Sequence, residues 1–248
     1  MHDHSMIRFS IIIPAYNEEL FLPRLLDSIE VARQIYREGR EAIEVIVADN
    51  ASTDDTARVA RSYGCRVVRV EKRVIAAARN GGARAARGEV LCFIDADSQI
   101  HPETFNAIDD CLGFNRVIAG MTGVRPERWS LGIFVTYCLL MPFAWLMNMD
   151  TGVVFCRRED FEAVGGYDES RLYAEDVAFL FALLRRGRER GQRLKRLKGV
   201  KALGATRKFD EFGDWHYFTL AARALWAWLK GEACDNKLAE SYWYKPKR

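Results

Sequence analysis

The sequence has no C-x-x-C pair, no apolar leader segment at its start and no low-complexity run. Its six cysteines are scattered, which is typical of reduced thiols in an intracellular protein, so we expect a cytoplasmic chain without disulfides. The formal net charge of +3 is too small to indicate nucleic-acid binding, and no nucleic-acid partner is expected. Residues 1–6, MHDHSM, resemble a tag remnant or a disordered start, so their histidines are not counted as metal ligands.

Length and composition favour one folded domain. With 248 residues, of which 49% are hydrophobic and 29% charged, the chain can bury a sizeable core, and intrinsic disorder is excluded. We therefore expect a single domain over residues 7–230, rather than two small ones, followed by a C-terminal tail at 231–248.

Short β-branched runs alternate with helical patterns along the first half of the chain. The strand-like runs are Phe9–Pro14, Ala42–Asp49, Cys65–Val70 and Glu89–Asp95. Helical patterns lie between them, at residues 18–39, 52–64 and 75–88, each finishing near a glycine. Ser52 or Thr53 is the expected cap of the second helix. This alternation predicts an α/β fold, with a mostly parallel central sheet covered by helices on both faces.

Polar side chains gather where three of these strands end. The chain leaves the first strand through AYNEE, the second through DNASTDD and the fourth through DADS. In a parallel sheet these ends lie at one rim, where ligands bind. The residues delivered to that rim are Asn17, Glu18, Asp49, Asn50, Asp95 and Asp97.

Several carboxylates at one rim repel one another unless a cation lies among them. Mg²⁺ or Mn²⁺ prefers oxygen ligands and commonly takes one or two carboxylates, so we predict such a site at Asp95 and Asp97. In an extended strand these two side chains would point to opposite faces, so the chain must turn between them. The alternative is that Asp97 caps a following helix and Asp95 ends a strand in water.

Several segments resemble, in their order and spacing, the motifs of family 2 glycosyltransferases. They are IIIPAYNEE, VIVADNASTDDT, ARNGGARAARGEVLCFIDADS, and TGVVFCRREDFEAVGGYDE followed by YAEDVAFLFALLRRG. The resemblance covers about Phe9 to Gly187. It implies a GT-A (Rossmann-like) fold, with a nucleotide-binding half at about 7–100 and an acceptor half at about 101–230. It also implies a nucleotide-diphosphate sugar donor, Mg²⁺ or Mn²⁺ as cofactor, and inversion at the anomeric carbon.

The resemblance assigns the donor nucleotide to the first half of the chain. Asp49 would accept a hydrogen bond from the base, which favours UDP over GDP because a carboxylate suits the imide edge of uracil. Asp95 would reach the ribose or a metal-bound water, and Asp97 would bind the metal that bridges the two phosphates. Arg79 would pair with diphosphate oxygens, with a surface helix arginine as the alternative. The implied nucleotide-binding residues are Pro14, Ala15, Tyr16, Glu18, Asp49, Arg79, Asp95 and Ala96.

Glycosyl transfer also needs a base that takes the proton from the acceptor hydroxyl. By the resemblance Asp176 is that base, and Glu175 lies close to the acceptor. The alternative is that both carboxylates merely stabilise the first turn of a helix through the helix dipole.

On the acceptor side, MDTGVVFCRRE is expected to form a strand that leads into a helix. The resemblance places acceptor or diphosphate contacts at Asp150, Thr151 and Gly152, although Thr151 departs from the glutamine that many relatives carry there. Arg207 is expected to close over the diphosphate. His216 is a further candidate ligand of the metal, with a purely structural histidine as the alternative.

Three later segments have no assigned role. Residues 130–149 carry no charge, but Gly132 and Pro142 interrupt them, so we expect a buried or interfacial helix rather than a membrane span. Residues 185–201 hold nine basic residues and one acid, which predicts a solvated helix end and turn, or a contact with anionic lipid or an acceptor phosphate. An aromatic amphipathic helix is predicted from near Asp214. The sequence leaves open whether these segments are core, homodimer face or contacts with the inner membrane surface, which would suit a lipid-linked acceptor.

Together these features predict a metal-dependent inverting glycosyltransferase that moves a sugar to an acceptor hydroxyl or lipid phosphate. A nucleotidyltransferase is the first alternative, but it would carry a glycine-rich basic loop after the first strand, where this sequence has PAYNEE. A nucleotide-sugar-binding module without turnover is the second, and the presence of Asp97 and Asp176 argues against it.

Overall fold

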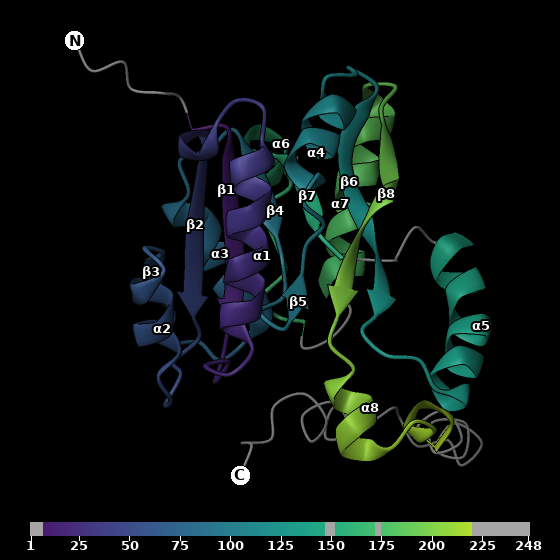
Figure 1. Cartoon of the computed structure of the whole chain (residues 1–248). Helices are drawn as coiled ribbons and strands as arrows, with labels where there is room; N and C mark the ends of the chain where they lie inside the picture. Colours follow the sequence, from purple (N-terminus) through teal and green to yellow (C-terminus); the bar gives the residue numbers. More distant parts are fainter. Residues whose placement is uncertain (1–6, 147–151, 172–174, 220–248) are drawn as a thin grey trace. The chain divides into compact units, whose positions relative to one another are not determined.

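The computed structural model describes residues 7–146, 152–171 and 175–219. Its internal contacts divide the chain into two compact units, Met1–Arg125 with Asn148–Gly204 and Pro126–Met147 with Ala205–Arg248. The first unit contains the sheet and all the strand ends predicted to bind a ligand (Figure 1).

An eight-stranded sheet forms the centre of the first unit, in the order β3-β2-β1-β4-β7-β6-β8-β5 (Figure 1). Its strands are β1 Phe9–Ala15, β2 Ile43–Asp49, β3 Arg66–Arg69, β4 Val90–Phe93, β5 Ser98–Gln99, β6 Val117–Pro126, β7 Val154–Arg157 and β8 Arg193–Gly204. β1 pairs in parallel with β2 and β4, and β2 with β3, whereas β7 is antiparallel to β4 and β6, and β5 to β8. The four strands predicted in the first half of the chain form the parallel part of the sheet, and the predicted α/β fold with a mostly parallel sheet is confirmed.

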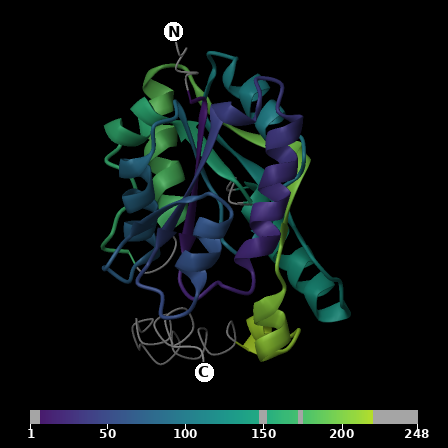
Figure 2. The same cartoon turned by 60° about the vertical axis from the view of Figure 1, so that its left-hand side comes forward.

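Helices cover both faces of this sheet. They are α1 Leu22–Ile35, α2 Thr56–Ser62, α3 Ile75–Ala85, α4 Thr104–Leu112, α6 Arg158–Ala163 and α7 Glu175–Glu189, with the short 3-10 helix Arg40–Ala42 before β2. Along β1, Ile11 and Ile13 join the core beneath α1 and α4, while Ile12 joins the core beneath α3 and α7, because successive strand residues point to opposite faces. Figure 2 shows α1 on one side of the sheet and α7 on the other.

Two glycines let α3 lie close to the sheet. A Cβ atom on Gly82 would be 2.5 Å from Ile12 Cγ2, and one on Gly81 would be 2.6 Å from Val70 Cγ2. Ile12 is buried and Val70 is half-buried, so a larger residue at either glycine would push the helix outward. The close packing holds Arg79 and Asn80, which directly precede these glycines, against the interior of the unit.

The predicted cap of α2 is wrong. The residue before the helix is Asp55, and its side chain makes no capping hydrogen bond. The Ser52 hydroxyl instead accepts a hydrogen bond from the Asn17 backbone N–H at 3.1 Å, and the Thr53 backbone N–H donates to Asn17 Oδ1 at 2.8 Å. Because the partner lies in another loop, the local sequence pattern could not show this use of the two residues.

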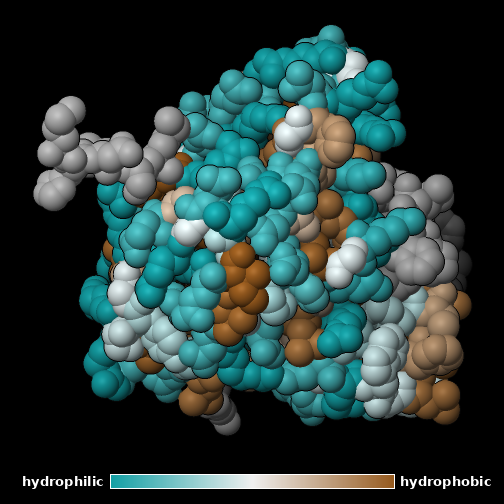
Figure 3. Space-filling view, turned by 45° about the horizontal axis from the view of Figure 1, so that its top comes forward, coloured by the Kyte–Doolittle hydropathy of each residue, from teal (hydrophilic) through white to brown (hydrophobic). Residues whose placement is uncertain are grey.

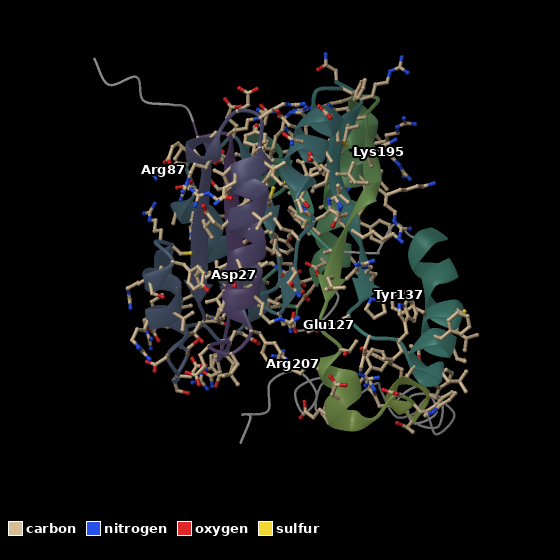
Figure 4. The ribbon with its side chains drawn as sticks, viewed as in Figure 1. Asp27, Arg87, Glu127, Tyr137, Lys195 and Arg207 are labelled. Carbon is tan, nitrogen blue, oxygen red and sulfur yellow. The ribbon has the colours of Figure 1, made fainter. Side chains whose placement is uncertain are left out.

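The basic segment 185–201 covers the end of α7 and the beginning of β8, so a strand follows the predicted helix end and turn. Val200 and Ala202 are buried on this strand, whereas Lys195 lies on its exposed side (Figure 4). The cations hide the alternating pattern of the strand in the sequence. The face shown in Figure 3 is largely hydrophilic, with apolar side chains in separate groups.

The second unit contains α5 Leu131–Leu146 and α8 Arg207–Phe212. Within it, Arg128 Nη2 lies 2.6 Å from Asp210 and 2.7 Å from Asp214, which ties the segment before α5 to the segments around α8. Residues 216–219 are helical, and the rest of the helix predicted from near Asp214 lies outside the described residues. Within the described ranges, no helix combines the length and apolarity that a membrane span requires.

Candidate active site

The carboxyl ends of β1 and β2 meet at one rim of the sheet. Ala15 lies opposite Asp49 in parallel register, and the Asn50 backbone N–H donates to the Ala15 carbonyl oxygen at 2.8 Å. Asp49 is buried, and its Oδ1 accepts a hydrogen bond from the Ser52 backbone N–H at 2.9 Å. Pro14, Ala15 and Asp49 are therefore brought together at this rim.

Hydrogen bonds connect the loops that follow β1 and β2. Asn17 has a positive φ of 54°, and its Nδ2 donates to Thr53 Oγ1 at 3.2 Å. The Glu18 backbone N–H donates to Thr56 Oγ1 at 2.8 Å. These bonds hold the backbone on either side of Asn17, and so fix the place of the rim residues predicted to bind a nucleotide.

Tyr16 follows β1 directly, and its ring has a cationic neighbour. The Arg73 guanidinium carbon lies 5.0 Å from the centre of the ring, within the range of a cation–π contact. Arg73 comes from the loop between β3 and α3, and it was not among the predicted site residues. It adds a positive charge beside the rim.

The chain turns between Asp95 and Asp97, as was required for both to serve one site. The Ser98 backbone N–H donates to the Asp95 carbonyl oxygen at 3.0 Å, which closes a four-residue turn. The Asp95 side chain is 52% exposed, Asp97 is half-buried, and Ala96 between them is buried. Since α4 begins only at Thr104, Asp97 does not cap a helix, and this part of the alternative is wrong.

A single buried guanidinium joins three carboxylates from distant parts of the sequence. Arg79 on α3 is 4% exposed, so the alternative of a surface arginine is wrong. Its Nη2 donates to Asp95 Oδ1 at 2.9 Å, and its Nη1 donates to Glu175 Oε1 at 2.8 Å and also to Asp176 Oδ1. The turn after β4 and the first turn of α7 are therefore held together by one side chain. We call Arg79, Asp95, Glu175 and Asp176 the Arg79 cluster.

The Arg79 cluster carries one positive charge against three carboxylates. Burial raises the pKa of Asp176, the Arg79 charge opposes this, the Asp95 and Glu175 carboxylates add to it, and the resulting pKa is about 7. Burial alone would lower the pKa of Arg79, but the surrounding carboxylates raise it well above its usual range, so the guanidinium stays charged. A carboxylate with a pKa near neutrality is suited to accept a proton at physiological pH.

The oxygen atoms of Asp95 and Asp97 fit a divalent cation such as Mg²⁺ or Mn²⁺. These cations commonly take one or two carboxylates and complete their coordination with water and phosphate oxygens. Among residues 7–146, 152–171 and 175–219, no group of three His, Cys, Asp or Glu side chains is placed to hold a metal. A cation at this turn would therefore depend on oxygens from water and a ligand as well as on the two aspartates.

Two predicted residues belong to the second unit. His216 is buried there, with Nδ1 2.8 Å from the Gly213 carbonyl oxygen and its ring against Phe209. Arg207 begins α8 (Figure 4). Their predicted roles toward the metal and the diphosphate stay predictions.

The predicted strand and helix on the acceptor side are β7 and α6, so this part of the prediction is confirmed. Gly152 precedes β7, and its N–H donates to the Thr122 carbonyl oxygen at 2.8 Å. A Cβ atom there would lie 2.6 Å from Thr122 Oγ1, so the position has no room for a side chain. Asp150 and Thr151 lie outside the described residues.

Comparison with known proteins agrees with this geometry. Residues 10–119, which include β2, β4 and the turn at Asp95, match the family described as Glycosyl transferase family 2. These residues belong to glycosyltransferase family 2. The resemblance recognised from the motifs is thereby confirmed.

One relative of this chain is validoxylamine A glucosyltransferase from Streptomyces hygroscopicus subsp. limoneus. It is 34% identical to this chain over 135 residues. The match covers 52% of this chain and 27% of that enzyme, so the chain spans only about a quarter of its relative's length.

Two solved structures have the same fold. The mannosyltransferase PcManGT from Pyrobaculum calidifontis, in complex with GDP-Man and Mn²⁺, has a TM-score of 0.62 at 24% identity, over 79% of this chain and 56% of that chain. S. aureus TarS 1-349, in complex with UDP-GlcNAc, has a TM-score of 0.63 at 20% identity, over 81% of this chain and 59% of that chain. At these identities the likeness shows the fold alone, and it confirms the predicted GT-A fold.

Sequence reasoning about the family 2 motifs missed the residues that surround the Arg79 cluster. The centre of the Tyr167 ring lies 5.1 Å from the Arg79 guanidinium carbon, and the Asn80 side chain bonds the Tyr167 backbone. Asn80 had a signal, since a polar amide in a helix of alanines and glycines commonly has a buried partner. Tyr167 had none, because its partners come from other elements.

Proposed function

We propose that this chain is a metal-dependent inverting glycosyltransferase of family 2. It would transfer a sugar from a nucleotide-diphosphate sugar to an acceptor hydroxyl or a lipid phosphate, with Asp176 as the general base. The observation that carries this proposal is the Arg79 bridge, which keeps Asp176 beside Asp95. A base and a donor site must be neighbours, since the acceptor oxygen and the leaving diphosphate react at the same carbon.

The donor would lie along the rim formed by β1, β2 and β4. At its nucleotide end, Asp49 is proposed to accept a hydrogen bond from the base, with Tyr16 beside it, and UDP is the preferred nucleotide. The similar structures contain UDP-GlcNAc in one case and GDP-Man in the other, so both nucleotides belong in the test. At its sugar end, the donor would reach the Arg79 cluster.

Mg²⁺ or Mn²⁺ held by Asp95 and Asp97 would neutralise charge on the leaving diphosphate. Asp176 would accept the proton of the acceptor hydroxyl while the acceptor oxygen forms its bond to the anomeric carbon. The bond between that carbon and the diphosphate oxygen breaks, and the nucleoside diphosphate leaves with the electron pair. Glu175 would lie close to the acceptor, and attack opposite the leaving group inverts the anomeric carbon.

Turnover of sugar nucleotides tests the proposal. With Mn²⁺, the protein should release nucleoside diphosphate from at least one of UDP-glucose, UDP-GlcNAc and GDP-mannose, slowly with water and faster with a sugar or polyprenyl phosphate acceptor. EDTA should stop the release, and the product should have the inverted anomeric configuration by NMR. Nucleotide binding without any release would indicate a binding module, and release that EDTA leaves unchanged would contradict the metal site.

A further inference from the structure

Asn80 follows Arg79 on α3, and both the oxygen and the nitrogen of its side-chain amide form hydrogen bonds with one turn of the chain. The residue is 7% exposed. Its Oδ1 accepts a hydrogen bond from the Tyr167 backbone N–H at 2.9 Å, and its Nδ2 donates to the Tyr167 carbonyl oxygen at 2.9 Å and to Glu169 Oε1 at 3.0 Å. Because the amide is buried, little water is available to replace these bonds if they are lost.

The turn that Asn80 binds approaches α3 closely. Gly165 and Gly166 have positive φ angles of 80° and 73°. A Cβ atom on Gly166 would lie 2.7 Å from Asn80 Oδ1, so this close approach depends on glycine. The position of Tyr167 relative to α3 is therefore fixed by the Asn80 amide.

The Tyr167 ring contacts the helix that bears the proposed base. Its centre lies 4.2 Å from that of Phe179 in a stacked arrangement, and 5.1 Å from the Arg79 guanidinium carbon. Phe179 is on α7, one helical turn after Asp176. Tyr167 thus contacts both the helix that bears Asp176 and the guanidinium that binds the Asp176 carboxylate.

We propose that Asn80 is a positioning residue for the transfer reaction, which fixes the Tyr167 turn and thereby the place of Asp176 relative to the donor. The inference rests on the proposed role of Asp176 as base. Within the part of the chain that the structure describes, the Asn80 side chain makes its hydrogen bonds with Tyr167 and Glu169, and not with the β1 and β2 rim where the nucleotide would bind. Loss of Asn80 should therefore slow the chemical step and leave donor affinity unchanged.

Asn80→Ala and Asn80→Asp test this inference. The alanine variant loses all three bonds, whereas the aspartate variant keeps the volume and the bond from the Tyr167 N–H but loses both donated bonds. Each should lower kcat by about 10- to 100-fold, since a misplacement of about 1 Å at a reacting group can cost that much. The substrate is whichever of UDP-glucose, UDP-GlcNAc and GDP-mannose the wild type turns over fastest, and its Kd with Mn²⁺, by calorimetry, should not change.

Asn106→Ala is the matched control. Asn106 is half-buried on α4, where its Oδ1 accepts from the Arg37 backbone N–H at 3.1 Å and its Nδ2 donates to Glu103 Oε2 at 2.8 Å. This variant also loses an amide that both accepts and donates hydrogen bonds, but Asn106 lies on the other face of the sheet from Asn80. Its kcat and its Kd for the donor should equal those of the wild type.

The calorimetric stoichiometry counts the folded, binding-competent molecules in each sample, and kcat is expressed per such molecule. A lower kcat in the Asn80 variants with unchanged Kd supports the inference. An unchanged kcat, or a kcat that falls together with donor affinity, overturns it. If Asn80→Ala does not fold, Asn80→Asp decides by the same criteria, and failure of both to fold would show a purely structural role. A wild type that turns over no sugar nucleotide would contradict the proposed function itself, and this inference with it.

Discussion

Asp176→Asn is expected to stop sugar transfer while making the folded protein more stable at neutral and alkaline pH. The amide cannot accept a proton, and loss of a general base typically lowers the rate by about 10²- to 10⁴-fold. Donor binding should persist, because the proposed nucleotide contacts lie at β1, β2 and the turn after β4. Release of nucleoside diphosphate measures the loss of transfer, and calorimetry with the nucleotide measures donor binding.

The gain in stability follows from the pKa of Asp176, which rises from an ordinary 3.8 to about 7 in the folded protein. Below about pH 4 the carboxyl is protonated in both the folded and the unfolded state. Between these two values the folded state keeps a proton that the unfolded state has released, so the free energy of unfolding of the wild type falls as pH rises, and the loss is complete above about pH 7. The advantage of the asparagine variant should therefore grow over this range.

Urea unfolding of the two proteins at pH 5 and pH 8 measures this advantage. Because the Asp176 side chain is 24% exposed, water reduces the effect, and about 1 to 2 kcal/mol is expected at pH 8. Asp27→Asn, at an exposed carboxylate on α1 (Figure 4), is the matched control and should change neither activity nor stability. An asparagine variant at position 176 that is less stable than the wild type at pH 8 would contradict the charge balance of the Arg79 cluster.

Arg79→Met should destabilise the fold by about 3 to 5 kcal/mol at pH 8, because it leaves the largely buried Glu175 and Asp176 carboxylates uncompensated. Methionine keeps an apolar stem of similar length but removes the charge and all three charged hydrogen bonds. The loss should become smaller at pH 5, where the carboxylates begin to take up protons and repel one another less. Urea unfolding of the wild type and the variant at both pH values gives the difference in the free energy of unfolding at each pH.

Two further variants sharpen this experiment. Arg79→Lys keeps the charge but cannot span the three carboxylates as the planar guanidinium does, so it should lie between wild type and Arg79→Met. Arg58→Met removes an exposed arginine that pairs with Asp55 at 2.6 Å, and it should have little effect. A loss in Arg79→Met as small as that of Arg58→Met, or one independent of pH, would show that the cluster is not the buried network described.

Three strands of the parallel half, β1, β2 and β4, could be predicted because they are almost entirely buried. β1 and β4 contain only buried residues, and apart from Ser10 in β1 they form apolar runs in the sequence. β8 could not be predicted, since most of its outward positions are cations and its buried positions are few. β5 is only two residues long, and its pairing with β8 rather than its own sequence makes it a strand.

The residues proposed to carry the chemistry could be named from the sequence, but the contacts that orient them could not. Asp95, Asp97 and Asp176 stand in short motifs whose order indicates their roles. The bridge made by Arg79 and the bonds made by Asn80 arise where α3 meets segments far away in the sequence, and no local pattern encodes them. The misassigned cap of α2 has the same cause, because Ser52 and Thr53 form hydrogen bonds with Asn17 in another loop and not with the helix.

Calorimetric titration of UDP and of GDP, each with Mn²⁺ and with EDTA, tests most directly whether acids at separate strand ends hold a cation and the diphosphate. At least one nucleotide should bind in Mn²⁺ and fail to bind in EDTA, and Asp97→Ala should lose the binding that depends on the metal. Equal affinity of the wild type for both nucleotides in Mn²⁺ and in EDTA would contradict the account.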